Sequence, residues 1–211
     1  GQPTVKPQAG IKVTSCVVSF GSIFYYPAND PIFDEEFLHD TYANTFRNFK
    51  YGVEASGGQI NIRNCIFQQM RPEPGPDGKP TGCGISVSNK CQLKVFATDD
   101  PANNRVLGYS LFESCAFAGI KSVNSRTNIS YAKFRLRQYY GIHSTANTTG
   151  QSVQLCNFEF GEDEPIAGIS MDQGTSVVNV DNQITVQKLG IAACALKINT
   201  ACVKGQTAAY D

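Results

Sequence analysis

A glycine followed by isoleucine or valine recurs along the chain and constrains its fold more than any other feature. Successive pairs are separated by 42, 32, 35, 22, 27 and 22 residues, and they begin at Gly10, Gly52, Gly84, Gly119, Gly141, Gly168 and Gly190. A second phrase alternates with them as "SCVV", "NCIF", "SCAF", "LCNF" and, without cysteine, "DNQI". Two phrases in fixed alternation indicate a structural repeat that insertions lengthen in places.

The segments around these phrases alternate apolar and polar residues, as in "QINIRNCIF", "GISVSN" and "NVDNQITVQ". This period of two is typical of short strands with one buried face, and no segment keeps a sustained helical spacing of apolar residues. Short strands that repeat at such intervals favour a coil in which each turn stacks on the last and pairs with it in parallel. We therefore predict an all-β fold, a right-handed parallel β-helix (solenoid) of about seven or eight turns.

In such a coil the glycine would mark the same corner of each turn, and the residue after it would point into the interior. The expected ladders are Ile120, Ile142, Ile169 and Ile191 in one column, and Phe117, Phe134 and Phe158 in another. A β-sandwich is the alternative, because it too has short strands and regular turns. A sandwich, however, gives no reason for Gly-Ile to recur at one phase.

Three segments rich in Pro, Gly and Asp account for the longer intervals, at 27–44, 71–82 and 98–105. We expect them to be loops inserted on the coil, so that residues 1–211 form a single β-helix domain. Neither end of the chain shows a helix that would cap the coil. Because an uncapped strand edge is a template for association, we expect this domain to be a section of a larger protein or to stack end to end with another copy.

The alternation of Gly-[Ile/Val] with phrases of the form N-C-x-F resembles the right-handed parallel β-helix proteins of the pectate-lyase-like superfamily. The resemblance covers most of residues 9–204 and is greatest to the non-catalytic β-helix repeat regions of large secreted bacterial surface proteins. It implies an extracellular or cell-surface location. It also implies an alternative activity, since β-eliminating enzymes of the superfamily use Arg or Lys bases with acidic groups that hold calcium.

Eight cysteines raise the question of disulfides or a metal site. We expect Cys16, Cys65, Cys115 and Cys156 to share one ladder about two turns apart, which is beyond disulfide reach, and to be buried thiols. A bridge would be sought first between Cys83 and Cys91, and between Cys194 and Cys202. With no C-x-x-C motif and two histidines, no metal site or cofactor is predicted.

The segment "KFRLRQYYGIH" at 133–143 is the sharpest candidate for a ligand site. If Phe134 and Leu136 point inward, one outer face presents Lys133, Arg135 and Arg137. The other three candidate residues lie nearby: Tyr139, Tyr140 and His143. This row could hold an anionic polysaccharide. The structural alternative is that Arg135 pairs with Glu159 on the next turn, in line with the alignment of Phe134 and Phe158, while Arg137 approaches the acidic segment 161–165.

Other classes of site have weaker support. The acidic segments 30–40 and 161–165 do not match a calcium-binding loop and are expected to be solvated, and His143 is expected at the surface. The 18 basic and 18 acidic residues cancel, and there is no phosphate-binding loop or basic–aromatic stretch, so no nucleic-acid partner is predicted. No apolar run has the length of a membrane span.

These observations favour a structural or adhesive β-helical module of a secreted or cell-surface protein, with a glycan or another copy of itself as partner. The alternative is a polysaccharide lyase or glycoside hydrolase acting on an anionic polysaccharide. Such an enzyme would present charged side chains from several consecutive turns on one face. Here only the strand at 133–137 is densely charged, which favours the non-enzymatic role, and no catalytic residue is assigned.

Overall fold

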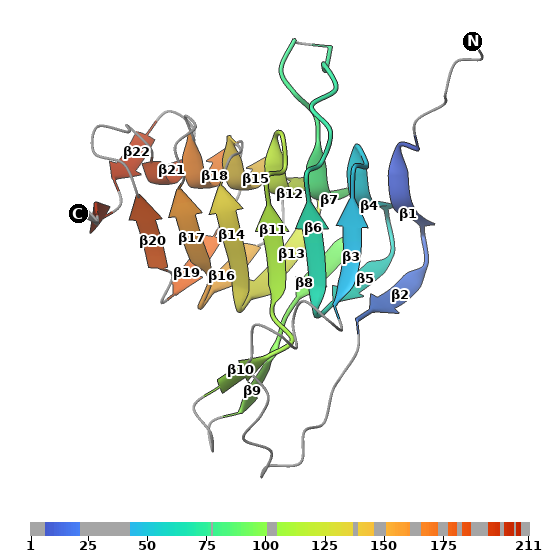
Figure 1. Ribbon diagram of the computed structural model, residues 1–211, viewed down its shortest axis with the longest axis horizontal. Helices are drawn as coiled ribbons and strands as arrows, with labels where there is room; N and C mark the ends of the chain where they lie inside the picture. The colour runs from blue at the N-terminus through green and yellow to red at the C-terminus, as the bar shows by residue number, and fades with distance from the viewer. Residues whose placement is uncertain are drawn as a thin grey trace.

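A computed structural model describes residues 7–21, 43–76, 78–100, 105–136, 139–145, 151–160, 166–172, 177–180, 183–186, 194–198, 201–204 and 206–207. Within these residues every regular element is a β-strand. Apart from the pairs β9–β10 and β21–β22, successive strands visit three sheets in rotation, and strands one turn apart pair in parallel (Figure 1). The fold is therefore a parallel β-solenoid, as the glycine repeat predicts.

The first sheet, sheet A, has eight strands, of which the last is antiparallel. Its strands in order are β1 (Ala9–Thr14), β4 (Tyr51–Ser56), β7 (Cys83–Ser88), β12 (Ala118–Val123), β15 (Tyr140–Thr145), β18 (Ala167–Asp172), β21 (Cys194–Ile198) and β22 (Ala201–Lys204).

The second sheet, sheet B, has six strands, one in each complete turn, so the described strands complete fewer turns than the seven or eight predicted. They are β2 (Val17–Phe20), β5 (Gln59–Ile62), β8 (Gln92–Val95), β13 (Arg126–Ser130), β16 (Gln151–Gln154) and β19 (Val177–Val180).

The third sheet, sheet C, has seven strands and faces the viewer in Figure 1. They are β3 (Asn44–Arg47), β6 (Cys65–Gln68), β11 (Ser110–Glu113), β14 (Ala132–Leu136), β17 (Asn157–Phe160), β20 (Gln183–Val186) and β23 (Gln206–Thr207).

The isoleucine ladder runs inside sheet A. Ile120 is in register with Ile142, which is in register with Ile169, and all three are fully buried. This part of the prediction is confirmed. Ile191 lies outside the described residues, and the residue in register with Ile169 is Leu196. The last repeat, from Ile169 to Leu196, is therefore 27 residues long, whereas the spacing of Gly168 and Gly190 predicts 22. Leu196 takes the position that the isoleucine of a Gly-Ile pair takes in the earlier turns.

A ladder of stacked phenylalanine rings fills the interior side of sheet C. It consists of Phe46, Phe67, Phe112, Phe134 and Phe158, with neighbouring ring centroids 5.0, 4.9, 4.8 and 4.6 Å apart and ring planes within 11° of parallel. Phe134 and Phe158 thus stack as predicted. The placement of Phe117 was wrong, because Phe112 occupies its rung and Phe117 follows in the corner between β11 and β12.

The repeated glycines bring sheet A close to this ladder. Each of the six that lie in the described part of the chain is the second residue of its strand and not a corner residue, so the expected role in a turn was wrong; Gly190 lies outside that part. A Cβ atom on Gly119 would lie 2.7 Å from Cδ1 of Phe134 and 2.9 Å from the carbonyl oxygen of Gly141. Gly52, Gly84 and Gly141 show the same approach to a ladder phenylalanine and to the next glycine carbonyl. The glycines are therefore required for packing.

The predicted single ladder of cysteines was wrong. Cys65 and Cys156 do occupy one column of sheet C, but Cys115 lies in the corner after β11, and Cys16 is exposed just before β2. The phrases "NCIF" and "SCAF" look alike, yet cysteine precedes the ladder phenylalanine in the first and follows Phe112 in the second. Cys83 and Cys91 are both free, and the side chains of Cys194 and Cys202 lie outside the described part of the chain.

Two of the three predicted insertions lie where the sequence predicts, and both contain paired backbone. Strands β9 (Thr98–Asp100) and β10 (Arg105–Leu107) pair in antiparallel and project from the coil (Figure 1). The segment 71–82 doubles back through an antiparallel bridge between Pro74 and Pro80. Most of the segment 27–44 lies outside the described residues. At the far end, β22 reverses direction against β21 and so interrupts the parallel pairing of sheet A.

We predict that Gly119→Ala lowers the free energy of unfolding by about 2 to 3 kcal/mol, because the added methyl group must displace both a stacked ring and a backbone carbonyl. Urea unfolding followed by circular dichroism measures this change. Ser86→Ala, a small change on the outer side of the same sheet, is the matched control and should shift stability by less than about 0.5 kcal/mol. Equal effects of the two substitutions would contradict close packing at the glycine.

Candidate binding site

The charged part of the predicted site lies on the outer side of sheet C. Arg135 is in register with Glu159, and its Nε atom lies 3.6 Å from a Glu159 carboxylate oxygen, which confirms the predicted ion pair. The Lys133 ammonium lies 4.1 Å from the centroid of the Tyr109 ring. Arg137 and the segment 161–165 lie outside the described residues. Both described cations of this strand therefore have a partner within the fold.

The aromatic part of the predicted site lies across the corner, on sheet A. Tyr140 is buried, and its ring centroid lies 4.6 Å from that of His143 and 5.3 Å from that of Phe117. His143 also contacts Phe117, at 5.2 Å, and is half-buried. Tyr139 packs against the same apolar cluster. The predicted residues thus divide between two sheets.

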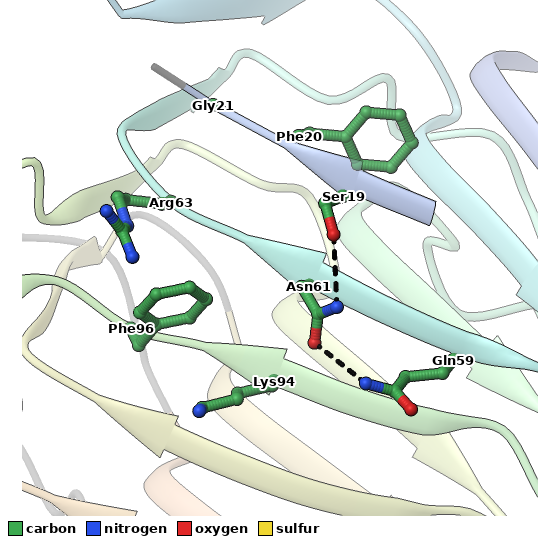
Figure 2. A pocket seen from close by; sticks show the side chains of 8 residues that line it. All are labelled: Ser19, Phe20, Gly21, Gln59, Asn61, Arg63, Lys94 and Phe96. Atoms are coloured by element: carbon green, nitrogen blue, oxygen red, sulfur yellow. Dashed lines mark hydrogen bonds between the residues drawn. The ribbon is translucent and has the colours of Figure 1, made fainter. Parts of the chain in front are cut away.

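The outer face of sheet B has a different composition, with no acidic residue in any of its strands. The sequences are VVSF, QINI, QLKV, RTNIS, QSVQ and VVNV. A hollow of about 450 Å³ opens on this face, across β2, β5 and β8 (Figure 2). It is lined by Ser19, Phe20, Gly21, Gln59, Asn61, Arg63, Lys94 and Phe96.

Two cations share one aromatic ring in this hollow. The Arg63 guanidinium carbon lies 4.3 Å from the centroid of Phe96, and the Lys94 ammonium lies 4.9 Å from it. Arg63 and Phe96 directly follow Ile62 and Val95, which are in register on β5 and β8, so the backbone places them side by side. Figure 2 shows Phe96 between the two cations. Within the described part of the chain, neither Arg63 nor Lys94 forms an ion pair.

A row of polar side chains leads away from the cations. The Gln59 side-chain amide donates a hydrogen bond to the Asn61 carbonyl oxygen, at 3.2 Å, and the Asn61 amide donates one to the Ser19 hydroxyl, at 3.1 Å (Figure 2). Ser19, Asn61 and Lys94 are in register on neighbouring strands. The register continues through Asn128 to Ser152, so a polar column crosses five strands of the sheet.

The hollow on sheet B was not predicted from the sequence, although the sequence contains one indication of it. The residues belong to three turns whose lengths differ because of insertions, so their register could not be read directly from the spacing. The detectable sign was the absence of Asp and Glu from the second strand of every turn.

The buried thiols offer no reactive nucleophile. Burial raises the pKa of Cys65, Cys83 and Cys156 to about 12, and that of Cys91 to about 11, from an ordinary value of 9.0. Burial also raises the pKa of Cys115 well above its ordinary value. These thiols remain protonated at neutral pH, and a protonated thiol is a poor nucleophile and metal ligand. Among the described residues no group of three or more His, Cys, Asp or Glu side chains could hold a metal ion.

Comparison with known proteins identifies no relative of this chain. No protein-family model matches it, and neither the curated protein sequences nor the solved structures include a significant match. In the part of the chain that is described, no helix is long and apolar enough to span a membrane.

We predict that a thiol reagent applied to the folded protein at pH 8 modifies Cys16 rapidly and modifies the five buried cysteines only after denaturation. Peptide mass spectrometry identifies the labelled residues. Because folding raises the pKa of the buried thiols, their contribution to stability is complete below about pH 9 and is lost as the pH rises toward about 12. The urea midpoint should therefore fall over that range. Rapid labelling of Cys65 or Cys156 in the folded protein would contradict the packing described.

Proposed function

We propose that this chain is a rigid β-helical module of a secreted or cell-surface protein, and that it binds a glycan without cleaving it. We also propose that it belongs with the β-helix repeat proteins of the pectate-lyase-like superfamily that its sequence phrases resemble. The single observation that supports glycan binding best is the outer face of sheet B, where polar and cationic side chains from consecutive turns surround a hollow with no acidic strand residue.

The chemistry of this face suits a sugar polymer. Side-chain amides and hydroxyls form hydrogen bonds in both directions, as sugar hydroxyls require, and Phe96 adds an apolar surface for a ring to contact. Adjacent strands lie about 4.8 Å apart, so the polar column repeats at regular intervals along the coil. A linear polymer could contact several turns at once, and the summed contacts would give useful affinity from weak single bonds.

A binding role is better supported than a lyase or hydrolase. Glycoside hydrolysis uses a pair of carboxyl groups across the scissile bond, and the strands of sheet B carry no carboxylate. On sheet C, Arg135 is engaged by Glu159 and Lys133 by Tyr109. An arginine held by a carboxylate is stabilised in its charged form and is a weak candidate for a base that removes a proton.

Affinity gel electrophoresis in gels containing single polysaccharides, acidic and neutral, tests this function. We expect at least one polymer to retard the protein, while the same mixtures in solution show no new reducing ends and no absorbance from unsaturated sugar products, with and without calcium. Retardation accompanied by product would establish the enzymatic alternative. Absence of retardation by every polymer would remove the glycan-binding function.

End-to-end self-association is a second proposed function, favoured by the first described turn. There β1, β2 and β3 each pair with one neighbouring strand. Ile11, Val18 and Phe46 are only partly buried, whereas Val53, Ile60 and Phe67, their partners on the next turn, are fully buried. The end of the core is thus open at this turn within the described residues, and unpaired strand edges with apolar neighbours favour pairing with another copy.

Sedimentation velocity tests this association through Val17, which is 73% exposed at the start of β2. We predict that the wild-type chain associates reversibly and that Val17→Lys shifts it toward the monomer, because an edge lysine opposes strand pairing. Leu155→Lys is the matched control, since Leu155 is also an exposed apolar residue but lies several turns away. A monomeric wild-type chain at high concentration would contradict this proposal.

A further inference from the structure

The geometry points to Arg63, Phe96 and Lys94 as a subsite for the acidic group of an anionic polysaccharide, with Asn61 binding an adjacent sugar hydroxyl. This inference rests on the proposed glycan-binding function and specifies its ligand class and location. The shared chemistry of the ligand is a carboxylate or sulfate group carried on a sugar ring.

The charge balance of the hollow is the first argument. Arg63 and Lys94 lie 4.3 and 4.9 Å from the centroid of the same ring, and two like charges gathered at one ring repel each other. The described part of the chain supplies neither with an ion-pair partner, in contrast to Arg135 and Lys12, which pair with Glu159 and Glu54 on the other two sheets. An acidic group bound beside the Phe96 ring, next to either cation, would lower this repulsion and form a charge-assisted hydrogen bond.

The fixed geometry of the two cations is the second argument. The face of Phe96 restricts both side chains through cation–π contacts, and Arg63 is only half-exposed. The Arg63 aliphatic carbons also lie close to Gly108, with Cγ 3.5 Å from the position that a Cβ atom would occupy there. A guanidinium held in place presents its donors as a fork that matches the two oxygens of a carboxylate or the oxygens of a sulfate. Less side-chain entropy is then lost on binding.

The neighbouring polar column favours a saccharide over a nucleic acid as the carrier of the anion. Next to the cations lie Asn61, Gln59 and Ser19, which form hydrogen bonds with one another and match the hydroxyl groups of a sugar. Single-stranded nucleic acid is usually bound by several aromatic side chains on which successive bases stack. Among the described residues that line this hollow, Phe20 packs against the core and only Phe96 contacts the cations.

The test compares two double variants that remove the same charge from different sheets. Arg63→Gln/Lys94→Gln changes the proposed subsite, and Lys133→Gln/Arg135→Gln changes the charged strand of sheet C. Affinity is measured by calorimetry with polygalacturonate for carboxylate, dextran sulfate for sulfate and unmodified dextran as the neutral polymer. We expect the sheet B variant to lose about tenfold or more in affinity for an acidic polymer, equivalent to about 1.4 kcal/mol, and the sheet C variant to retain wild-type affinity.

Each other outcome has a defined meaning. Loss of binding in the sheet C variant alone would overturn this subsite and leave the glycan-binding function in place. The same conclusion would follow if the wild-type chain bound neutral dextran and neither double variant changed that affinity. Equal binding of a single-stranded oligonucleotide would overturn the saccharide assignment. Failure of the wild-type chain to bind any polymer would overturn the proposed function itself. Thermal unfolding of both variants checks that each remains folded, and Phe96→Leu should weaken acidic-polymer binding without any change of charge.

Discussion

The close contact between the glycines of sheet A and the phenylalanine ladder of sheet C is the constraint on which the rest of the structure depends. The rings of Phe112 and Phe134 reach the glycine backbone so closely that a methyl group on Gly84 or Gly119 would lie 2.7 Å from a ring atom. Because rings stacked at 4.6 to 5.0 Å match the spacing of adjacent strands, the five turns from Phe46 to Phe158 stack in step with the ladder. Insertions must therefore leave the coil at its corners, where they do not disturb this packing.

A uniform core leaves the outer faces free to differ, and their charges show that they do. Sheets A and C place acidic and basic residues on neighbouring turns, as in Lys12 with Glu54 and Arg135 with Glu159. Surface pairs of this kind contribute about 0 to 1 kcal/mol each, so they add little stability, but they place opposite charges side by side on the face that carries them. Sheet B has basic and amide side chains without acidic ones. With a chain of zero net charge, the absence of acidic residues from the strands of sheet B distinguishes this face from the other two.

The sequence predicted the solenoid and its isoleucine column because Gly-Ile marks one phase of the repeat. The prediction for Phe117 was wrong, because the phrase "SCAF" around Cys115 resembles "NCIF" around Cys65. The correct rung was recoverable, since Phe112 precedes Gly119 by the same seven residues that separate Phe134 from Gly141. The hollow on sheet B was harder to predict. Its residues come from turns whose lengths differ by insertions, so only the three-dimensional register aligns Asn61 with Lys94.

The positions of the insertions connect the core constraint to the proposed site. The connection between β2 and β3 starts at Gly21, and the one that carries the β9–β10 hairpin starts at Phe96, and both of these residues line the hollow. Both insertions therefore leave the coil at the same corner, next to the two cations. The rigid strands fix the spacing of Arg63, Phe96 and Lys94, while the inserted segments are the part of the chain whose length and sequence can change without altering the core. If the proposed site binds a polymer, selection for a particular polymer would act on these segments, since a change in the glycine and phenylalanine ladders would disturb the packing of the core.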